Sequence, residues 1–223
     1  MIKDKIMEIS AALPKGVRLI AVSKTKPNED ILEAYDAGQR LFGENYATEL
    51  RDKAVGLPKD IQWHFIGHLQ GKQLKYYIPF VSMIHGVDSL THLEEVDRAA
   101  AKVERVVSVL LQVHVAQEET KFGFLPEEIE TAEIQSVVPA LKNVRICGVM
   151  GMASHTDDQA RVRSDFRRIR QIYEQLHRGV FAGNEDFCEV SMGMSHDWPI
   201  AVEEGSTMVR IGSSIFGPRN YAS

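Results

Sequence analysis

Residues 17–30 read VRLIAVSKTKPNED, and this stretch decides the fold. Its first seven residues form a mostly apolar, β-branched run that is typical of a buried strand. Asn28 is placed to cap a following helix, and Gly38 is placed to end it. A strand that leads directly into a helix is the repeating unit of α/β folds with parallel strands.

The same unit recurs along the chain. Seven further apolar runs follow, separated by stretches with helical spacing, at residues 40–45, 61–67, 81–87, 106–115, 144–150, 187–192 and 208–212. Parallel strands need long connections, so the alternation predicts right-handed crossovers through helices. Eight such units favour a closed (β/α)8 TIM barrel over a doubly wound open sheet. We expect residues 1–223 to form one barrel domain, because no change of composition or Ser/Gly linker divides them.

Composition limits the classes of function. A formal net charge of −5 disfavours a nucleic-acid partner, since binding a phosphate backbone needs clustered positive charge. The two cysteines, Cys147 and Cys188, form no CxxC pair, which suits a reducing cytosol. The apolar spacing of residues 2–13 predicts an amphipathic helix rather than a signal peptide, and no run is long enough to cross a membrane. We therefore expect a cytoplasmic protein with a small-molecule partner.

Two short turns indicate what that molecule carries. SMGMS at 191–195 and VRIGSS at 209–214 follow the seventh and eighth strands and are rich in Gly and Ser. Glycines let backbone N–H groups approach an anion, and serine hydroxyls add donors. In TIM barrels a phosphate site commonly lies after these two strands. Together the turns predict a site for a phosphate group.

Lys24 ends the first strand, so it belongs to the same barrel mouth. Many lysines at strand ends simply reach water, but an amine in a partly desolvated pocket can attack a carbonyl carbon. Pyridoxal 5′-phosphate carries both an aldehyde and a phosphate. Arg210, inside the eighth strand, is expected to face the barrel interior, where it is placed to partner the pyridine nitrogen. A barrel enzyme that acts on a phosphosugar through Lys24 is an alternative.

We assign no metal-binding or catalytic role to the other polar side chains in or near the strands. Five histidines lie in or just after strands, namely His64, His85, His114, His155 and His196. No HxH or HExxH run accompanies them, so we expect ordinary polar contacts and no metal site. The pair Glu44 and Glu49 is interpreted as charge at a helix start rather than as an acid/base couple.

Several motifs carry a family resemblance through nearly the whole chain. They are AVSKTKP (21–27), FGENY (42–46), WHFIGHLQ (63–70), GVDS (86–89), EETKFGF (118–124), SMGMSHDW (191–198) and GSTMVRIGSSIFGPR (205–219). With these motifs the chain resembles the YggS/PROSC group of pyridoxal phosphate homeostasis proteins. Their barrel is similar to the N-terminal domain of alanine racemase, a fold-type III enzyme.

The resemblance implies a protein of intracellular pyridoxal phosphate homeostasis that holds the cofactor as a Schiff base on Lys24 without efficient catalysis. PLP-dependent apo-enzymes are the implied recipients. By the same resemblance, Asn45 lies on the cofactor's face and Arg210 meets the pyridine nitrogen. The residues implied to hold the phosphate are Ser191, Met192, Gly193, Gly212 and Ser213.

An active amino-acid racemase is the main alternative. The resembled racemase uses a tyrosine of a second domain on the opposite face of the cofactor, and we expect no such domain here. Tyr46 and Tyr221 are the candidate substitutes. The chain departs from the family pattern at Lys72, Gln73 and His114, none of which is an expected cofactor contact.

Overall fold

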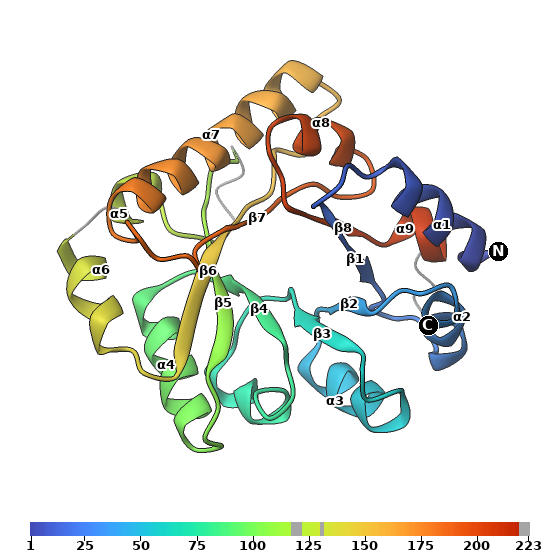
Figure 1. Ribbon diagram of the computed structural model, residues 1–223, viewed down its shortest axis with the longest axis horizontal. Coiled ribbons are helices and arrows are strands. Elements are labelled where there is room, and N and C mark those ends of the chain that lie inside the picture. Colours follow the sequence, from blue (N-terminus) through green and yellow to red (C-terminus); the bar gives the residue numbers. More distant parts are fainter. Residues whose placement is uncertain (117–121, 130–131, 219–223) are drawn as a thin grey trace.

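Eight parallel strands close into a barrel in the computed structural model, which describes residues 1–116, 122–129 and 132–218 (Figure 1). Strand β1 pairs with β2 on one side and with β8 on the other, so the first and last strands are neighbours. Each strand lies within one of the eight apolar runs, which confirms the predicted TIM barrel. The strands are β1 Arg18–Val22, β2 Leu41–Glu44, β3 Gln62–Phe65, β4 Met83–Val87, β5 Val107–Gln112, β6 Val144–Met150, β7 Glu189–Ser191 and β8 Met208–Ile211.

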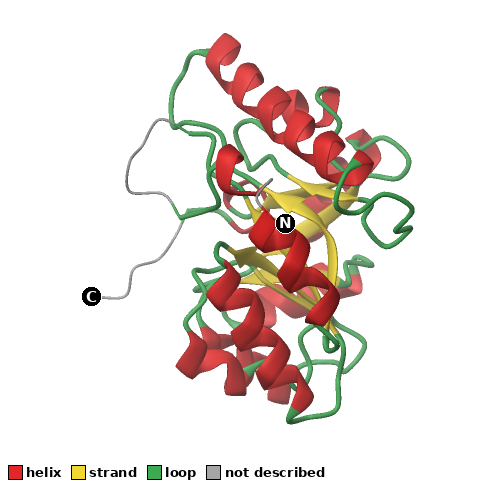
Figure 2. Cartoon of the chain, turned by 90° about the vertical axis from the view of Figure 1, so that its left-hand side faces the viewer, coloured by secondary structure: helices red, strands yellow, loops and turns green. Residues whose placement is uncertain are grey.

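The helices lie outside the ring of strands and cover it (Figures 1 and 2). The expected alternation is incomplete, because only the short 3-10 helix η1 lies between β3 and β4. One helix start also differs from expectation, since Pro27 is the N-cap of α2 and Asn28 is its first residue. The helices are α1 Ile2–Ala12, α2 Asn28–Asp36, α3 Ala47–Gly56, η1 Gly71–Tyr76, α4 Leu90–Ala101, α5 Pro126–Ile129, α6 Ala132–Val137, η2 Val138–Ala140, α7 Gln159–Arg178, α8 Trp198–Glu203 and α9 Ser213–Phe216.

Two groups of apolar side chains form the core among the residues that the structure describes. The larger group lies between the strands and the outer helices and includes Leu19 and Ala21 of β1. Ile20 lies between them in the strand, so its side chain points the other way, into the barrel. There it packs in the second group, which consists of Ile20, Met83, Leu110, Cys147, Met150 and Met208. The barrel is therefore a packed core whose ligand must bind at one end.

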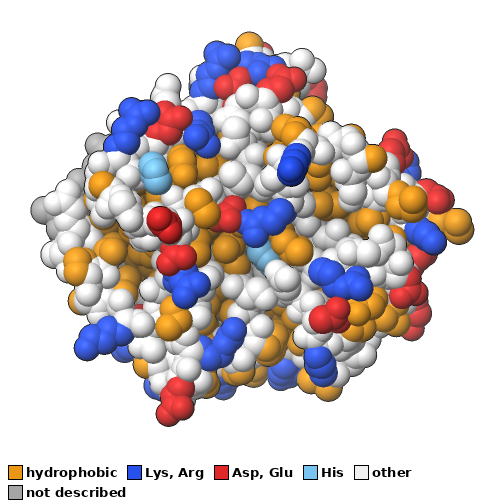
Figure 3. Space-filling view, in the orientation of Figure 1, with side chains coloured by type: hydrophobic (Ala, Val, Ile, Leu, Met, Phe, Trp, Pro, Cys, Tyr) orange, Lys and Arg blue, Asp and Glu red, His pale blue; other side chains and the backbone are white. Residues whose placement is uncertain are grey.

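Helix α7 carries several arginines on its outer face. The side chains that it buries are mostly apolar and include Val162, Phe166 and Ile169. Outside, Arg163 and Arg167 form ion pairs with Glu204 at 2.6 and 2.9 Å. The helix is thus a solvated outer helix. The face seen in Figure 3 likewise mixes basic and acidic side chains.

No helix among the described residues combines the length and the apolar content needed to cross a membrane.

Candidate ligand-binding site

A cavity of about 330 Å³ lies at the carboxyl ends of the strands. It is lined by residues that follow strands far apart in sequence, from β1 to β8. Five residues expected to contact a cofactor line it together: Lys24, Asn45, Arg210, Gly212 and Ser213. The fold therefore brings an amine, an amide, a guanidinium and a hydroxyl to one site.

Three other predicted contacts lie elsewhere. Ser191 is the last residue of β7 and is fully buried, and neither it nor Met192 nor Gly193 is among the residues that line the cavity. The cavity is lined instead by the residues just beyond them, which include Ser195 and His196. Strand β7 ends at Ser191, so the residues that reach the barrel mouth come a few positions later. The position of the strand end is therefore what identifies the lining residues.

Gly193 shapes this turn. Its φ is +95°, and its carbonyl oxygen accepts the N–H of Arg210 at 2.9 Å. A Cβ atom at this position would lie 2.6 Å from Cβ of Ala201 in α8. Only glycine satisfies both the backbone conformation and the close approach. Gly193 thus supports the mouth from outside the cavity.

Lys24 lies in a tight turn at the end of β1. The N–H of Lys26 donates to the carbonyl of Ser23 at 3.1 Å, and Thr25 has a φ of 63°. These features match a type II turn with Lys24 and Thr25 at its central positions. A β-branched residue in left-handed backbone costs about 1–3 kcal/mol, so the surrounding structure must hold the turn in place.

Buried charges lie beside this turn. Oε1 of Glu44, which is fully buried at the end of β2, lies 2.8 Å from Nζ of Lys53 and accepts the Ser23 hydroxyl at 2.6 Å. The same Nζ lies 2.6 Å from Oε1 of Glu49. Burial raises the pKa of Glu44 to about 6, although the Lys53 ammonium opposes this. We call Glu44, Lys53 and Glu49 the charge cluster.

The charge cluster corrects one interpretation of the sequence. Glu49 does lie in the first turn of α3, as a helix-start charge should. Glu44 does not, because it is the final residue of a strand and is fully buried. Its ion pair with a lysine of the following helix is the reason that a carboxylate is tolerated there.

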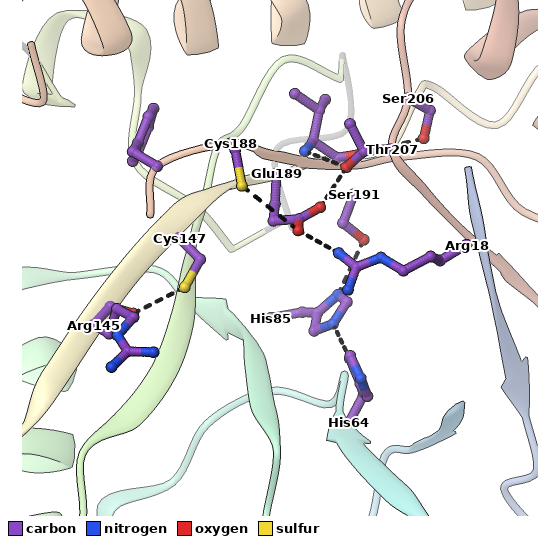
Figure 4. A network of polar contacts seen from close by, with 12 residues as sticks. Arg18, His64, His85, Arg145, Cys147, Cys188, Glu189, Ser191, Ser206 and Thr207 are labelled. Atoms are coloured by element: carbon purple, nitrogen blue, oxygen red, sulfur yellow. Dashed lines mark hydrogen bonds and ion pairs between the residues drawn. The ribbon is translucent and has the colours of Figure 1, made fainter. Parts of the chain in front are cut away.

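A chain of hydrogen bonds crosses the barrel interior below the cavity. Nδ1 of His64 lies 2.8 Å from Nε2 of His85, and Nδ1 of His85 lies 3.0 Å from the Ser191 hydroxyl (Figure 4). Arg210 donates to that hydroxyl at 2.7 Å and to the carbonyl of Gly151 at 3.1 Å. Burial lowers the pKa of His64 to about 3 and that of Arg210 to about 10. The histidines make polar contacts, as predicted, and through Ser191 they help to fix Arg210.

The second lysine of the turn has a different role. Nζ of Lys26 donates to the carbonyl oxygens of Phe216 and Pro218 at 2.8 and 2.9 Å. Although Lys26 also lines the cavity, its amine is committed to these acceptors. It links the turn after β1 to the segment after β8.

The residues that depart from the family pattern lie away from the cavity lining. Lys72 and Gln73 are in η1, and the Gln73 side chain donates to that of Gln70 at 2.7 Å. His114 follows β5, and its Nε2 lies 2.9 Å from the carbonyl oxygen of Ala116. Tyr46, at 53% exposure, is not among the lining residues, and Tyr221 falls outside the described residues.

Comparison with known proteins places this barrel in a family. The sequence matches the family described as "Alanine racemase, N-terminal domain" over residues 1–220. The "Pyridoxal phosphate homeostasis protein" of Aquifex aeolicus is 38% identical, over 92% of this chain and 88% of that protein. The human protein of the same name is 36% identical, over 99% of this chain and 85% of that protein. The chain therefore belongs to the alanine racemase N-terminal domain family, in the group of pyridoxal phosphate homeostasis proteins.

Solved structures agree with this placement. PipY of Synechococcus elongatus, solved with PLP bound, is 35% identical and superposes with a TM-score of 0.86 over 97% of this chain and all of PipY. Alanine racemase from Bartonella henselae, at 13% identity, shares the fold with a TM-score of 0.71 over 98% of this chain and 58% of its own length.

Proposed function

We propose that this protein binds pyridoxal 5′-phosphate at the barrel mouth and serves in its homeostasis inside the cell. The observation that carries the proposal is that Lys24, Arg210, Gly212 and Ser213 line one cavity, although they come from opposite ends of the chain. The names of the relatives and the PLP-bound structure of PipY support it. We propose further that residues 1–223 form one domain, that the protein is cytoplasmic, and that PLP-dependent apo-enzymes receive the cofactor.

The residues present fit this cofactor. A cavity of about 330 Å³ lies within the size range of small-molecule sites. Among the described residues, Oδ1 of Asn45 is buried without a hydrogen-bond partner, and Asn45 lines the cavity. A buried acceptor of this kind is costly unless a ligand donates to it. A ligand whose ring carries a hydroxyl or N–H group can donate the hydrogen bond that Oδ1 of Asn45 lacks.

The roles of four lining residues then follow. When bound, pyridoxal 5′-phosphate would supply an aldehyde, the group that condenses with a primary amine as water is released. Lys24 provides that amine. We assign the phosphate to Gly212 and Ser213, because both line the cavity in the turn after β8 and a Gly–Ser turn offers backbone N–H and hydroxyl donors to an anion. Arg210 would donate to the ring nitrogen and, with a pKa of about 10, would stay charged at neutral pH and keep that nitrogen unprotonated.

We propose a carrier rather than a racemase. Racemisation needs an acid/base group on each face of the cofactor, and Lys24 serves only one face. Among the described residues that line the cavity, none is a tyrosine. His155 and His196 do line it, so they are the side chains to examine if an activity is found.

One experiment tests the proposal against its alternatives. The purified protein is stripped of ligand, titrated with pyridoxal 5′-phosphate, and followed by visible absorption before and after borohydride reduction. We expect a new visible band that reduction removes, together with a mass increase of the protein. If no band or adduct forms, the protein is not a pyridoxal phosphate carrier. Adduct formation with a phosphosugar instead would support the aldolase-like alternative.

A further inference from the structure

The turn that carries Lys24 is held on both sides by the charge cluster. Nζ of Lys53 donates to the carbonyl oxygen of Ser23 at 2.7 Å, before Lys24 in the chain. Oε1 of Glu49 accepts the N–H of Thr25 at 2.6 Å, after it. The two peptide units that flank the lysine therefore depend on the same group of charges.

This turn needs support at Thr25. Its φ of 63° lies in the left-handed region, where type II turns favour Gly or Asn. A threonine there is strained, so the backbone relaxes to negative φ unless a contact opposes it. The carboxylate of Glu49 provides that contact, and charged acceptors make the stronger hydrogen bonds to N–H groups.

We propose that Glu49 is a positioning residue for Lys24, and that Lys53 and Glu44 hold its carboxylate in place. None of these three residues is among those that line the cavity, so the cluster acts through the backbone of the turn. Its effect is to keep the Lys24 amine at the orientation from which it reaches the aldehyde. This inference rests on the proposed function, because it concerns the attachment of the cofactor to Lys24.

Glu49 is the member of the cluster best suited to substitution. Its side chain is 23% exposed, whereas those of Glu44 and Lys53 are 0% and 7% exposed. Removing Lys53 leaves the buried Glu44 carboxylate without its ion pair, and removing Glu44 takes one of two partners from the buried Lys53 ammonium, so either change endangers the fold. Asp52 lies on the same helix at 66% exposure and offers a matched control.

The test separates attachment from binding. Stripped wild-type protein, Glu49→Ala, Glu49→Gln and Asp52→Ala are mixed with pyridoxal 5′-phosphate, and the adduct is trapped with borohydride over time. The affinity for pyridoxine 5′-phosphate, which has the ring and the phosphate but no aldehyde, is measured in parallel, as is the melting temperature.

We expect Glu49→Ala to slow attachment on the order of 10-fold to 100-fold, because a small misplacement of a reacting group has this effect. Its affinity for pyridoxine 5′-phosphate should stay unchanged, and Asp52→Ala should match the wild type in both. Glu49→Gln keeps a carbonyl acceptor for the Thr25 N–H, so it should retain most of the rate. The double variant Glu49→Ala/Thr25→Asn should attach faster than Glu49→Ala alone, since Asn tolerates left-handed backbone.

Attachment at the wild-type rate in Glu49→Ala would overturn the inference. An equal loss of pyridoxine 5′-phosphate affinity would do the same, because it would show a general defect of the cavity. If the wild-type protein itself forms no adduct, the proposed function fails and the inference with it.

Discussion

Nδ1 of His64 and Nε2 of His85 are 2.8 Å apart inside the barrel, and both rings are buried. Arg210 can only donate, so the Ser191 hydroxyl accepts from it. The same hydroxyl lies 3.0 Å from Nδ1 of His85, which joins both imidazoles to the arginine. Burial lowers the pKa of both rings, which favours their neutral forms.

This arrangement predicts that acid destabilises the protein. Burial lowers the pKa of His64 from 6.5 to about 3 and that of His85 well below 6.5. Below pH 6.5 the unfolded chain binds protons that the folded barrel excludes, so the free energy of unfolding falls as the pH falls. Between pH 4.5 and about 6, Glu44 has the opposite effect on the free energy of unfolding, because the folded protein protonates this carboxylate and the unfolded chain does not. In that range Glu44 offsets the contribution of one of the two histidines. Each net proton is worth about 1.4 kcal/mol per pH unit.

Urea unfolding at several pH values between 7 and 5 measures this slope. His64→Gln, which can still accept from His85, should reduce the slope by about one proton. His196→Gln, at an exposed position, should leave it unchanged. A free energy of unfolding that stays constant or rises on acidification would contradict the prediction.

We expect Lys24→Ala to abolish both the visible band and borohydride trapping of pyridoxal 5′-phosphate. Lys26→Ala should preserve trapping, because the Lys26 amine is bound to the carbonyl oxygens of Phe216 and Pro218. Peptide mapping of the reduced protein locates the adduct. Its recovery on Lys26 or Lys72 would show that Lys24 is not the reactive amine.

Pyridoxal should bind far more weakly than its phosphate ester. Charge-assisted hydrogen bonds contribute about 1.5–3 kcal/mol each, so the loss of two lowers affinity by about 100-fold or more. Equilibrium titration of both compounds tests this. Ser213→Ala should weaken binding of the ester alone, and Ser191→Ala shows whether the predicted phosphate role of that buried serine holds. Equal affinities for the two compounds would refute a phosphate site.

Gly67→Ala should damage the site through the backbone of Asn45. A Cβ at residue 67 would lie 2.1 Å from the Asn45 carbonyl oxygen, so the turn after β2 must move. Such overpacking costs about 1–3 kcal/mol. We expect a lower melting temperature and weaker cofactor binding. Gly56→Ala is the control, because its Cβ would meet only Nδ2 of Asn28 at 3.4 Å. Equal behaviour of the two variants would contradict the role of Gly67.

The protein should exchange the α-proton of L-alanine slowly and without efficient racemisation. A missing acid/base group costs roughly 10²–10⁴ in rate. Deuterium exchange and chiral chromatography with several amino acids test this. Turnover on the order of 1–10³ s⁻¹ would falsify the carrier proposal. Variants of Tyr46, His155, His196 and Tyr221 would then identify the second base.

The two strands β6 and β7 show how far the sequence predicts the fold. The run 144–150 coincides with β6, whereas only residues 189–191 of the run 187–192 form β7. Phe187 lies outside the strand, and its apolar ring is instead used to stack on Phe181, at a centroid distance of 4.2 Å. The strand end at Ser191 therefore could not be placed from hydrophobicity alone.

The site was predictable in part for a similar reason. Lys24 and Arg210 stand out because a lysine at a strand end and an arginine within a strand break a local pattern. Lys53 breaks no local pattern, since a lysine in an amphipathic helix is ordinary. Its burial against Glu44 depends on how α3 folds back on the ends of β1 and β2, and no sequence spacing reports that contact.

Closure of the barrel between β1 and β8 has a consequence for how the chain is made. Lys26 binds the carbonyl oxygen of Phe216, 190 residues further along, and the lining of the cavity is divided between these two ends. During translation, Lys24 at the end of β1 emerges from the ribosome early, and the residues that follow β8 emerge last. A nascent chain therefore presents the amine without the pocket, and loading with cofactor must wait until residues up to about 218 have emerged and β8 has paired with β1.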